Sequence, residues 1–331
     1  MKKSVTLLVI LLLSGLLVPG AAALNVVTTM PNLWNVADEI GGDAITVLYV
    51  APPAAVHISG DTIDALLQQN SEFIKTADVF LGQGGTMDGA VITKVTEFRT
   101  KNFGEDTNWL LLGNVSKEVV PNATVTYDNP TSLRGYSETI AYLLSTADPV
   151  NASVYQENLQ TYLAKVAGAT RLTAAEQETL ADIPILCHFR IKNQAVNWLG
   201  MNCIDSYPQP ATVRDIIDDI HKDPAKYKAI AGNSSIGKII VIENIVAGPE
   251  MGIGIHEALR DAGVPCERII FLNLPKSAEN VDSILDYYAY NKNLILSLSS
   301  SDAVPAPTQS PLGLLAGAAG VFGAVLLSRR S

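Results

Sequence analysis

Short apolar runs rich in β-branched residues recur along this chain and alternate with segments of helical periodicity. This alternation predicts βα units and parallel sheets. Four runs fall in each half of the sequence, at 25–28, 45–50, 79–81 and 109–112, and then at 183–187, 201–204, 238–242 and 268–272. We therefore expect an α/β protein of two lobes, each built on a parallel sheet.

One long helix is expected to join the lobes. Asp148 and Pro149 form a helix start, and apolar residues then follow at helical spacing. These residues are Tyr155, Leu159, Tyr162, Leu163 and Val166. The expected domains are an N-terminal lobe at 24–147, a linker helix at 148–182 (helical from about 149 to 180) and a C-terminal lobe at 183–296.

Both ends of the chain indicate export. Lys2 and Lys3 precede an apolar run and a cleavage site after Ala23, the layout of a signal peptide at 1–23. A linker at 297–310 leads to 311–331, in which 312–327 carries no charge and Arg329 and Arg330 follow. This segment predicts a C-terminal membrane anchor or sorting signal, with arginines on the cytoplasmic side. The expected location is the cell surface.

The exported part is acidic. Without Lys2, Lys3, Arg329 and Arg330, 19 basic residues face 33 acidic ones, a formal charge of 19 − 33 = −14. Such a surface excludes nucleic acid as a partner and tolerates cations. Four N-x-Ser/Thr sequons permit glycosylation, at Asn114, Asn122, Asn151 and Asn233.

Three cysteines, without a C-x-x-C pair, predict one disulfide and one free thiol in an oxidising compartment. We expect Cys187 to pair with Cys203, because both lie at the ends of neighbouring strands. Cys266 would remain free.

Two of the four histidines occupy matching places in the two halves. His57 follows the second apolar run after a proline-stiffened loop, and His188 ends the fifth. Ligands of open α/β sheets bind beyond the carboxyl ends of the strands, and a neutral imidazole there can ligate a metal. His221 and His256 lie in polar helical patterns and are expected at the surface.

Two later strand ends offer further oxygens. Glu243 could supply an anionic ligand or cap the following helix, and Asn273 offers a neutral carbonyl. The glycines between Gly82 and Gly85 lack the phosphate-loop lysine and predict a tight turn. No catalytic motif is present, so nothing favours an enzyme or an organic cofactor.

The order of these features resembles the metal-binding, TroA-like solute-binding proteins of zinc and manganese ABC transporters. The resemblance spans about residues 25–296. It rests on VVTTMP at 26–31, IGGD at 40–43, Pro52 and Pro53 before His57, KTAD at 75–78, Asp148 and Pro149 with Tyr155 and Asn158, CHF at 187–189 and Leu199 with Gly200. It implies two lobes with parallel sheets, joined by one linker helix.

In that family, three histidines and a carboxylate surround the metal. The resemblance places His57 and His188 at the first and third histidine, Val125 at the second and Asn273 at the carboxylate. Glu243, Asp128 or a water would have to complete the shell. Metal binding would then fade below about pH 6, as the imidazoles take up protons.

The resemblance implies a receptor that passes zinc, manganese or iron to an ABC permease. Half of the expected ligands are missing, however, and so is the family's histidine-rich loop. Two alternatives therefore stay open, namely the same fold binding a non-metal ligand or a metal chelate, and a surface adhesin.

Overall fold

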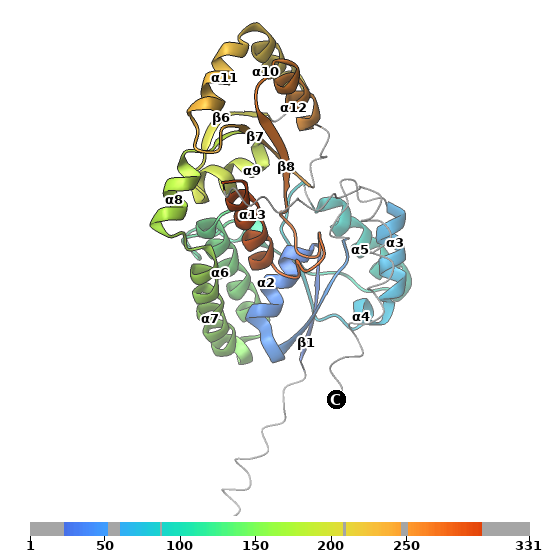
Figure 1. The fold of residues 1–331 in the computed structure, drawn as a ribbon. Helices are drawn as coiled ribbons and strands as arrows, with labels where there is room; N and C mark the ends of the chain where they lie inside the picture. Colours follow the sequence, from blue (N-terminus) through green and yellow to red (C-terminus); the bar gives the residue numbers. More distant parts are fainter. Residues whose placement is uncertain (1–22, 52–59, 87, 208–209, 246–250, 300–331) are drawn as a thin grey trace, which may run out of the picture.

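The computed structural model describes residues 23–51, 60–86, 88–207, 210–245 and 251–299. Figure 1 shows two α/β lobes, one above the other, with helices packed around each sheet. All eight predicted strands are present, and the predicted α/β class is confirmed.

The N-terminal sheet is parallel, in the order β2-β1-β3-β4. Its strands are β1 (Leu24–Thr28), β2 (Ile45–Tyr49), β3 (Val79–Gly82) and β4 (Trp109–Leu111). The helices of this lobe are α2 (Pro31–Gly41), η1 (Gly42–Ala44), α3 (Gly60–Gln69), α4 (Ser71–Lys75), α5 (Gly89–Phe103), η2 (Leu112–Asn114) and α6 (Pro130–Ala147).

The C-terminal sheet is also parallel and repeats the same pattern, in the order β6-β5-β7-β8. Its strands are β5 (Pro184–His188), β6 (Asn202–Tyr207), β7 (Ile239–Asn244) and β8 (Cys266–Phe271). Its helices are α9 (Phe189–Lys192), the π-helical turn η4 (Asn193–Trp198), α10 (Pro210–Lys222), α11 (Pro224–Asn233), α12 (Met251–Asp261) and α13 (Ile284–Ser299).

The expected linker helix is present but interrupted. It consists of η3 (Pro149–Asn151), α7 (Ala152–Thr170) and α8 (Ala174–Ala181). The break falls at 171–173, because Thr173 starts α8 with a capping box to Glu176. The carbonyl of Thr170 at the break accepts the indole N–H of Trp198 at 2.8 Å.

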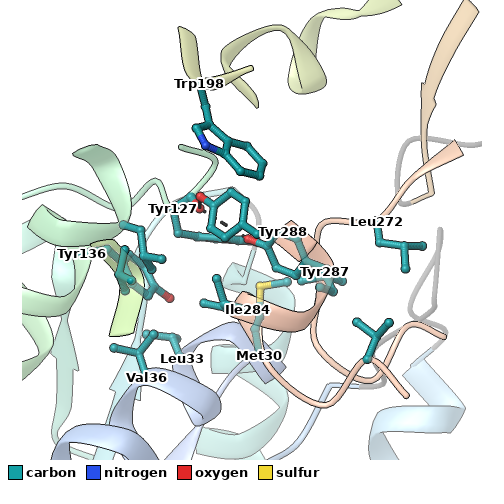
Figure 2. Close-up of a cluster of buried hydrophobic side chains, with 14 of the residues drawn as sticks. Met30, Leu33, Val36, Tyr127, Tyr136, Trp198, Leu272, Ile284, Tyr287 and Tyr288 are labelled. Carbon is teal, nitrogen blue, oxygen red and sulfur yellow. Dashed lines mark hydrogen bonds between the residues drawn. The ribbon is translucent and has the colours of Figure 1, made fainter. Parts of the chain in front are cut away.

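A single hydrophobic core crosses the lobe boundary. It joins Val26 and Leu33 of the N-terminal lobe to Ile185 and Ile240 of the C-terminal lobe. Figure 2 shows its centre, where Tyr287 and Tyr288 of α13 lie among side chains from α2, the 127 loop and η4.

The tyrosines of α13 fix a loop of the other lobe. The hydroxyl of Tyr288 donates to the carbonyl of Tyr127 at 2.8 Å, and that of Tyr287 reaches the same oxygen at 3.4 Å. The backbone N–H of Ile284, at the start of α13, donates to Asn35 Oδ1 of α2 at 2.9 Å. Helix α13 therefore belongs to both lobes.

The predicted membrane segment cannot be compared with the fold. Within the described part of the chain, no helix is long and apolar enough to cross a membrane. Residues 312–327 lie outside that part, as does the signal-like segment at 1–22.

The contact of Tyr288 with Tyr127 gives a first prediction. Tyr288→Phe removes the stronger donor from a buried carbonyl, so the free energy of unfolding should fall by about 1 to 3 kcal/mol. Urea unfolding, followed by the fluorescence of Trp198 on the Tyr288 ring, measures this change. Tyr142→Phe, at a position 36% exposed, should change it by less than about 0.5 kcal/mol. Equal losses in the two variants would refute the role of this hydrogen bond.

Candidate functional site

The carboxyl ends of both sheets point toward the lobe boundary. In Figure 1, β1 rises toward the upper lobe, and β8 descends to the loop that leads into α13. That loop reaches the other lobe, because Lys276 Nζ lies 5.8 Å from the ring centroid of Trp34 in α2. His188, the last residue of β5, and Asn273, in the loop after β8, therefore lie on the sides of their strands that face this boundary.

His188 is the one predicted histidine ligand that can be described. It ends β5, is 3% exposed, and packs edge-on against Tyr207 at 5.8 Å between ring centroids. Its Nδ1 accepts the backbone N–H of Arg190 at 3.2 Å and so caps α9. His57 lies outside the described residues, and its expected proximity to His188 stays a prediction.

The cap decides which nitrogen of His188 carries the proton. Because Nδ1 accepts a hydrogen bond, the proton of the neutral imidazole is placed on Nε2. In this tautomer Nε2 donates a hydrogen bond and has no lone pair for a metal. Ligation through Nε2 requires the proton to move and the cap to break, at a cost of about 1 kcal/mol.

His188 is neutral over an unusually wide pH range. Burial, together with the nearby Arg190, lowers the pKa of its imidazole to about 4. Proton competition at His188 is therefore expected well below the pH 6 predicted from the sequence. His221 is exposed as expected, whereas His256 is half-buried on α12, with its pKa lowered by burial and by Arg260.

Asn273 offers an oxygen without a partner. Its Oδ1 is buried and accepts no hydrogen bond within the described chain. The loop is held by Asn291 of α13, whose Oδ1 accepts from the Leu272 N–H at 2.9 Å and whose Nδ2 donates to the Leu272 carbonyl at 2.7 Å. Since buried carbonyls are normally hydrogen-bonded, Asn273 Oδ1 is open to a water or a ligand atom.

Glu243 is held by its own lobe. One carboxylate oxygen accepts the Gly252 N–H near the start of α12 at 2.7 Å, and the other pairs with the Arg268 guanidinium. The carboxylate is 1% exposed, and breaking a buried ion pair of this kind is expensive. Glu243 therefore has the helix-capping role that the sequence left open, and metal ligation would require these contacts to break.

Asp128 bridges the two lobes. Its Oδ1 accepts the Ser132 hydroxyl at 3.0 Å in the first turn of α6, and its Oδ2 accepts Asn193 Nδ2 of the C-terminal lobe at 2.8 Å. Val125, which the resemblance placed where a second histidine was expected, packs against the shared core. The loop after β4 therefore supplies a lobe contact here.

A polar network on the N-terminal side was not predicted from the sequence. Asp88 Oδ2 accepts the Thr29 hydroxyl at 2.9 Å and the Gln83 N–H at 2.6 Å. The Tyr136 hydroxyl accepts Asn32 Nδ2 at 2.6 Å and lies 3.4 Å from Gln83 Nε2. Oδ1 of Asp88 and Oδ1 of Asn32 are buried and have no partner within the described chain.

The sequence offered one signal for this network. Gln83 lies within the glycine-rich stretch at 82–85, which was interpreted as a tight turn, and Asp88 follows that stretch. That turn is confirmed, since Gly84 and Gly85 have φ angles of +77° and +131°. The partners Asn32 and Tyr136 come from α2 and α6, and no local pattern links them.

The described residues do not form a complete metal shell. Among them, no group of three His, Cys, Asp or Glu side chains could hold an ion. A shallow polar pocket of about 470 Å³ is lined by Lys117, residues 121–124, Asn129, Thr131, Ser132 and Asn197. None of the predicted metal ligands lines it.

The pKa of His188 gives a second prediction. Its pKa of about 4 in the folded protein lies below the ordinary histidine pKa of 6.5, so below pH 6.5 the unfolded chain binds a proton that the folded chain does not. The contribution of the neutral His188 to the free energy of unfolding is complete above pH 6.5 and is lost as the pH falls to about 4. The loss is on the order of 3 kcal/mol. His188→Asn keeps a capping oxygen and does not titrate. Its free energy of unfolding should fall less than that of wild type over this range. Parallel curves would contradict the assignment.

Comparisons with known proteins identify the family and the fold. The family profile described as "Zinc-uptake complex component A periplasmic" matches residues 26–248, about two thirds of the chain. No curated protein matches the sequence.

Solved structures resemble the whole fold at low sequence identity. The Mn-bound periplasmic metal binding protein from candidatus Liberibacter asiaticus aligns with a TM-score of 0.56 and 13% identity, over 82% of this chain and 98% of that one. Its Cd-bound form gives a TM-score of 0.55 and 13% identity over the same shares. A crystal structure titled ZnuA gives 0.53 and 14%, over 84% and 98%. The likeness to these structures shows the fold, and the profile shows the membership: this chain belongs to the family of periplasmic zinc-uptake complex component A.

Proposed function

We propose that this protein captures a divalent transition-metal ion of the zinc or manganese class outside the cell and delivers it to an ABC importer. The family is one of solute-binding transport proteins. The observation that carries the proposal is His188, a buried imidazole at the carboxyl end of β5 near the lobe boundary. The acidic surface of the exported part tolerates the approach of cations.

The proposed ligands are His57, His188 and the free oxygen of Asn273, with water completing the shell. Glu243 and Asp128 are assigned structural roles, because both carboxylates are engaged within the fold. Such a shell carries little negative charge, and His188 has to release its cap before it can bind. Both features predict weaker binding than a site with three histidines and a carboxylate.

A second candidate ligand has a specific observation in its favour. In its capping tautomer, His188 presents an N–H donor, which suits a ligand with acceptor oxygens, such as a metal chelate or a small organic anion. Chelator treatment separates the two cases. Excess chelator would abolish the binding of a bare ion and leave the binding of a non-metal ligand intact.

Titration calorimetry with zinc and manganese tests the metal proposal. His57→Ala and His188→Ala should each weaken binding by more than about 100-fold, the upper range for loss of a group that only orients a ligand. His221→Ala, at an exposed position of α10, is the matched control and should leave the affinity unchanged.

The carboxylates provide a second control in the same titration. Glu243→Gln and Asp128→Asn should have little direct effect on affinity once correct folding is confirmed. Tight binding that is indifferent to both His57→Ala and His188→Ala would mean that the site lies elsewhere.

We also propose that residues 311–331 tether the mature protein to the membrane. The proposal rests on the uncharged run at 312–327 and the two arginines that follow it. Helix α13, the last described element, extends into the predicted linker and ends at Ser299, so a deletion after Gln309 touches no described element. Deletion after Gln309 should therefore release folded protein into the medium, measured by fractionation and circular dichroism. Truncated protein that stays on the membrane would refute the proposal.

A further inference from the structure

Two thiols lie side by side, and one of them directly precedes His188 in the chain. Cys187 Sγ of β5 and Cys203 Sγ of β6 are 3.8 Å apart, and both are unbonded in this structure. The predicted partners are thus neighbours. A disulfide, with sulfurs about 2.0 Å apart, requires a further approach of less than about 2 Å.

The two cysteines are diagonal neighbours across the strand pair, because Cys203 pairs with Ile185 and Cys187 with Ser206. The parallel register of β5 and β6 shifts between Ile185 and Leu186, so that Ile185 pairs with Cys203 and Leu186 with Asp205. Residue 204 is therefore extra in β6, and an irregularity of this kind bends a strand locally. It lies beside Cys203, where an adjustment of the backbone is needed.

The two sulfurs differ in access. Cys187 is fully buried in the shared core, whereas Cys203 is partly exposed, with its sulfur 3.3 Å from the Asp205 carbonyl. The third thiol, Cys266, is 3.7 Å from the His256 carbonyl, at the start of β8. Strand β7 separates β8 from β5, so Cys266 cannot compete for Cys187.

We propose that Cys187 and Cys203 form a redox-closed staple that fixes the end of β5 from which His188 projects. The oxidant is an extracytoplasmic disulfide carrier. Cys203 thiolate attacks one sulfur of the carrier, which gives a mixed disulfide and releases one carrier thiol. Cys187 thiolate then attacks Cys203 Sγ, closes the protein disulfide and releases the second carrier thiol. Two electrons and two protons pass to the carrier in all.

The staple acts on the site through the backbone. Cys187 immediately precedes His188, but the two side chains lie on opposite faces of β5, as strand alternation requires. Cys187 packs in the shared core, and His188 packs on Tyr207, which belongs to a separate cluster of buried apolar residues in the C-terminal lobe. The staple therefore contributes no ligand, and it restrains the strand end that carries the His188 cap on α9.

Peptide mapping of the full-length protein tests the proposal without assuming any cargo. The reduced protein is incubated with oxidised glutathione as the carrier, then alkylated and digested without reduction. Linkage of Cys187 to Cys203, with Cys266 alkylated, is the expected result. Alkylation of all three cysteines, or a link to Cys266, would overturn the proposal.

Variants test the order of attack. Cys187→Ala should accumulate a mixed glutathione disulfide on Cys203, whereas Cys203→Ser should leave Cys187 without glutathione. Cys266→Ser is the matched control and should behave as wild type. Glutathione on Cys187 in the Cys203→Ser variant would reverse the assigned order.

Two physical readouts test the role of the staple. The disulfide would close the segment from Cys187 to Cys203 into a loop. This closure should raise the melting temperature by roughly 5 to 10 °C in wild type and Cys266→Ser, and not in Cys203→Ser. The amide of Arg190, which donates to His188, should exchange with solvent more slowly in the oxidised protein. Equal exchange in the two redox states would overturn the positioning role.

Discussion

The burial of apolar side chains from both lobes in one continuous core is the constraint on which the rest of the structure depends. Helix α13 follows the last strand of the C-terminal sheet, yet its tyrosines hold the carbonyl of Tyr127 in the N-terminal lobe. Opening the lobes would expose this aromatic contact and leave a buried carbonyl unpaired. The lobes should therefore behave as a rigid pair, with the carboxyl edges of both sheets held at a set distance.

Structural contacts also explain why the carboxylates of Asp128 and Glu243 are poor metal ligands. Asp128 ties α6 to Asn193 of the other lobe, and Glu243 ties the start of α12 to Arg268. Each carboxylate already has donors on both oxygens, so a cation would have to displace groups that stabilise the fold. Five buried side-chain oxygens have no partner within the described residues, and three of them belong to amide or carboxylate groups, those of Asn273, Asn32 and Asp88. Two of these three are neutral amides, which suits a weakly charged cargo or ordered water.

His188 has two roles that compete. As an N-cap it needs a lone pair on Nδ1, and as a metal ligand through Nε2 it needs the proton on Nδ1 instead. Its burial favours the neutral ring in either case. The protein therefore has a built-in cost for binding a bare ion at this residue, and no such cost for a ligand that accepts a hydrogen bond.

The sequence by itself determined the eight strands, the α/β class and the two-lobe order, because hydrophobic periodicity and turn residues are local signals. It also placed His188 and Asn273 at strand ends and made Cys187 and Cys203 neighbours. Tertiary structure alone decided the shared core and the engagement of Glu243 and Asp128. It also decided the tautomer of His188 and the network around Asp88. These depend on which side chains from distant elements meet, such as Tyr288 with Tyr127 or Arg268 with Glu243, and a hydrogen-bond partner far along the chain leaves no periodic trace in the sequence.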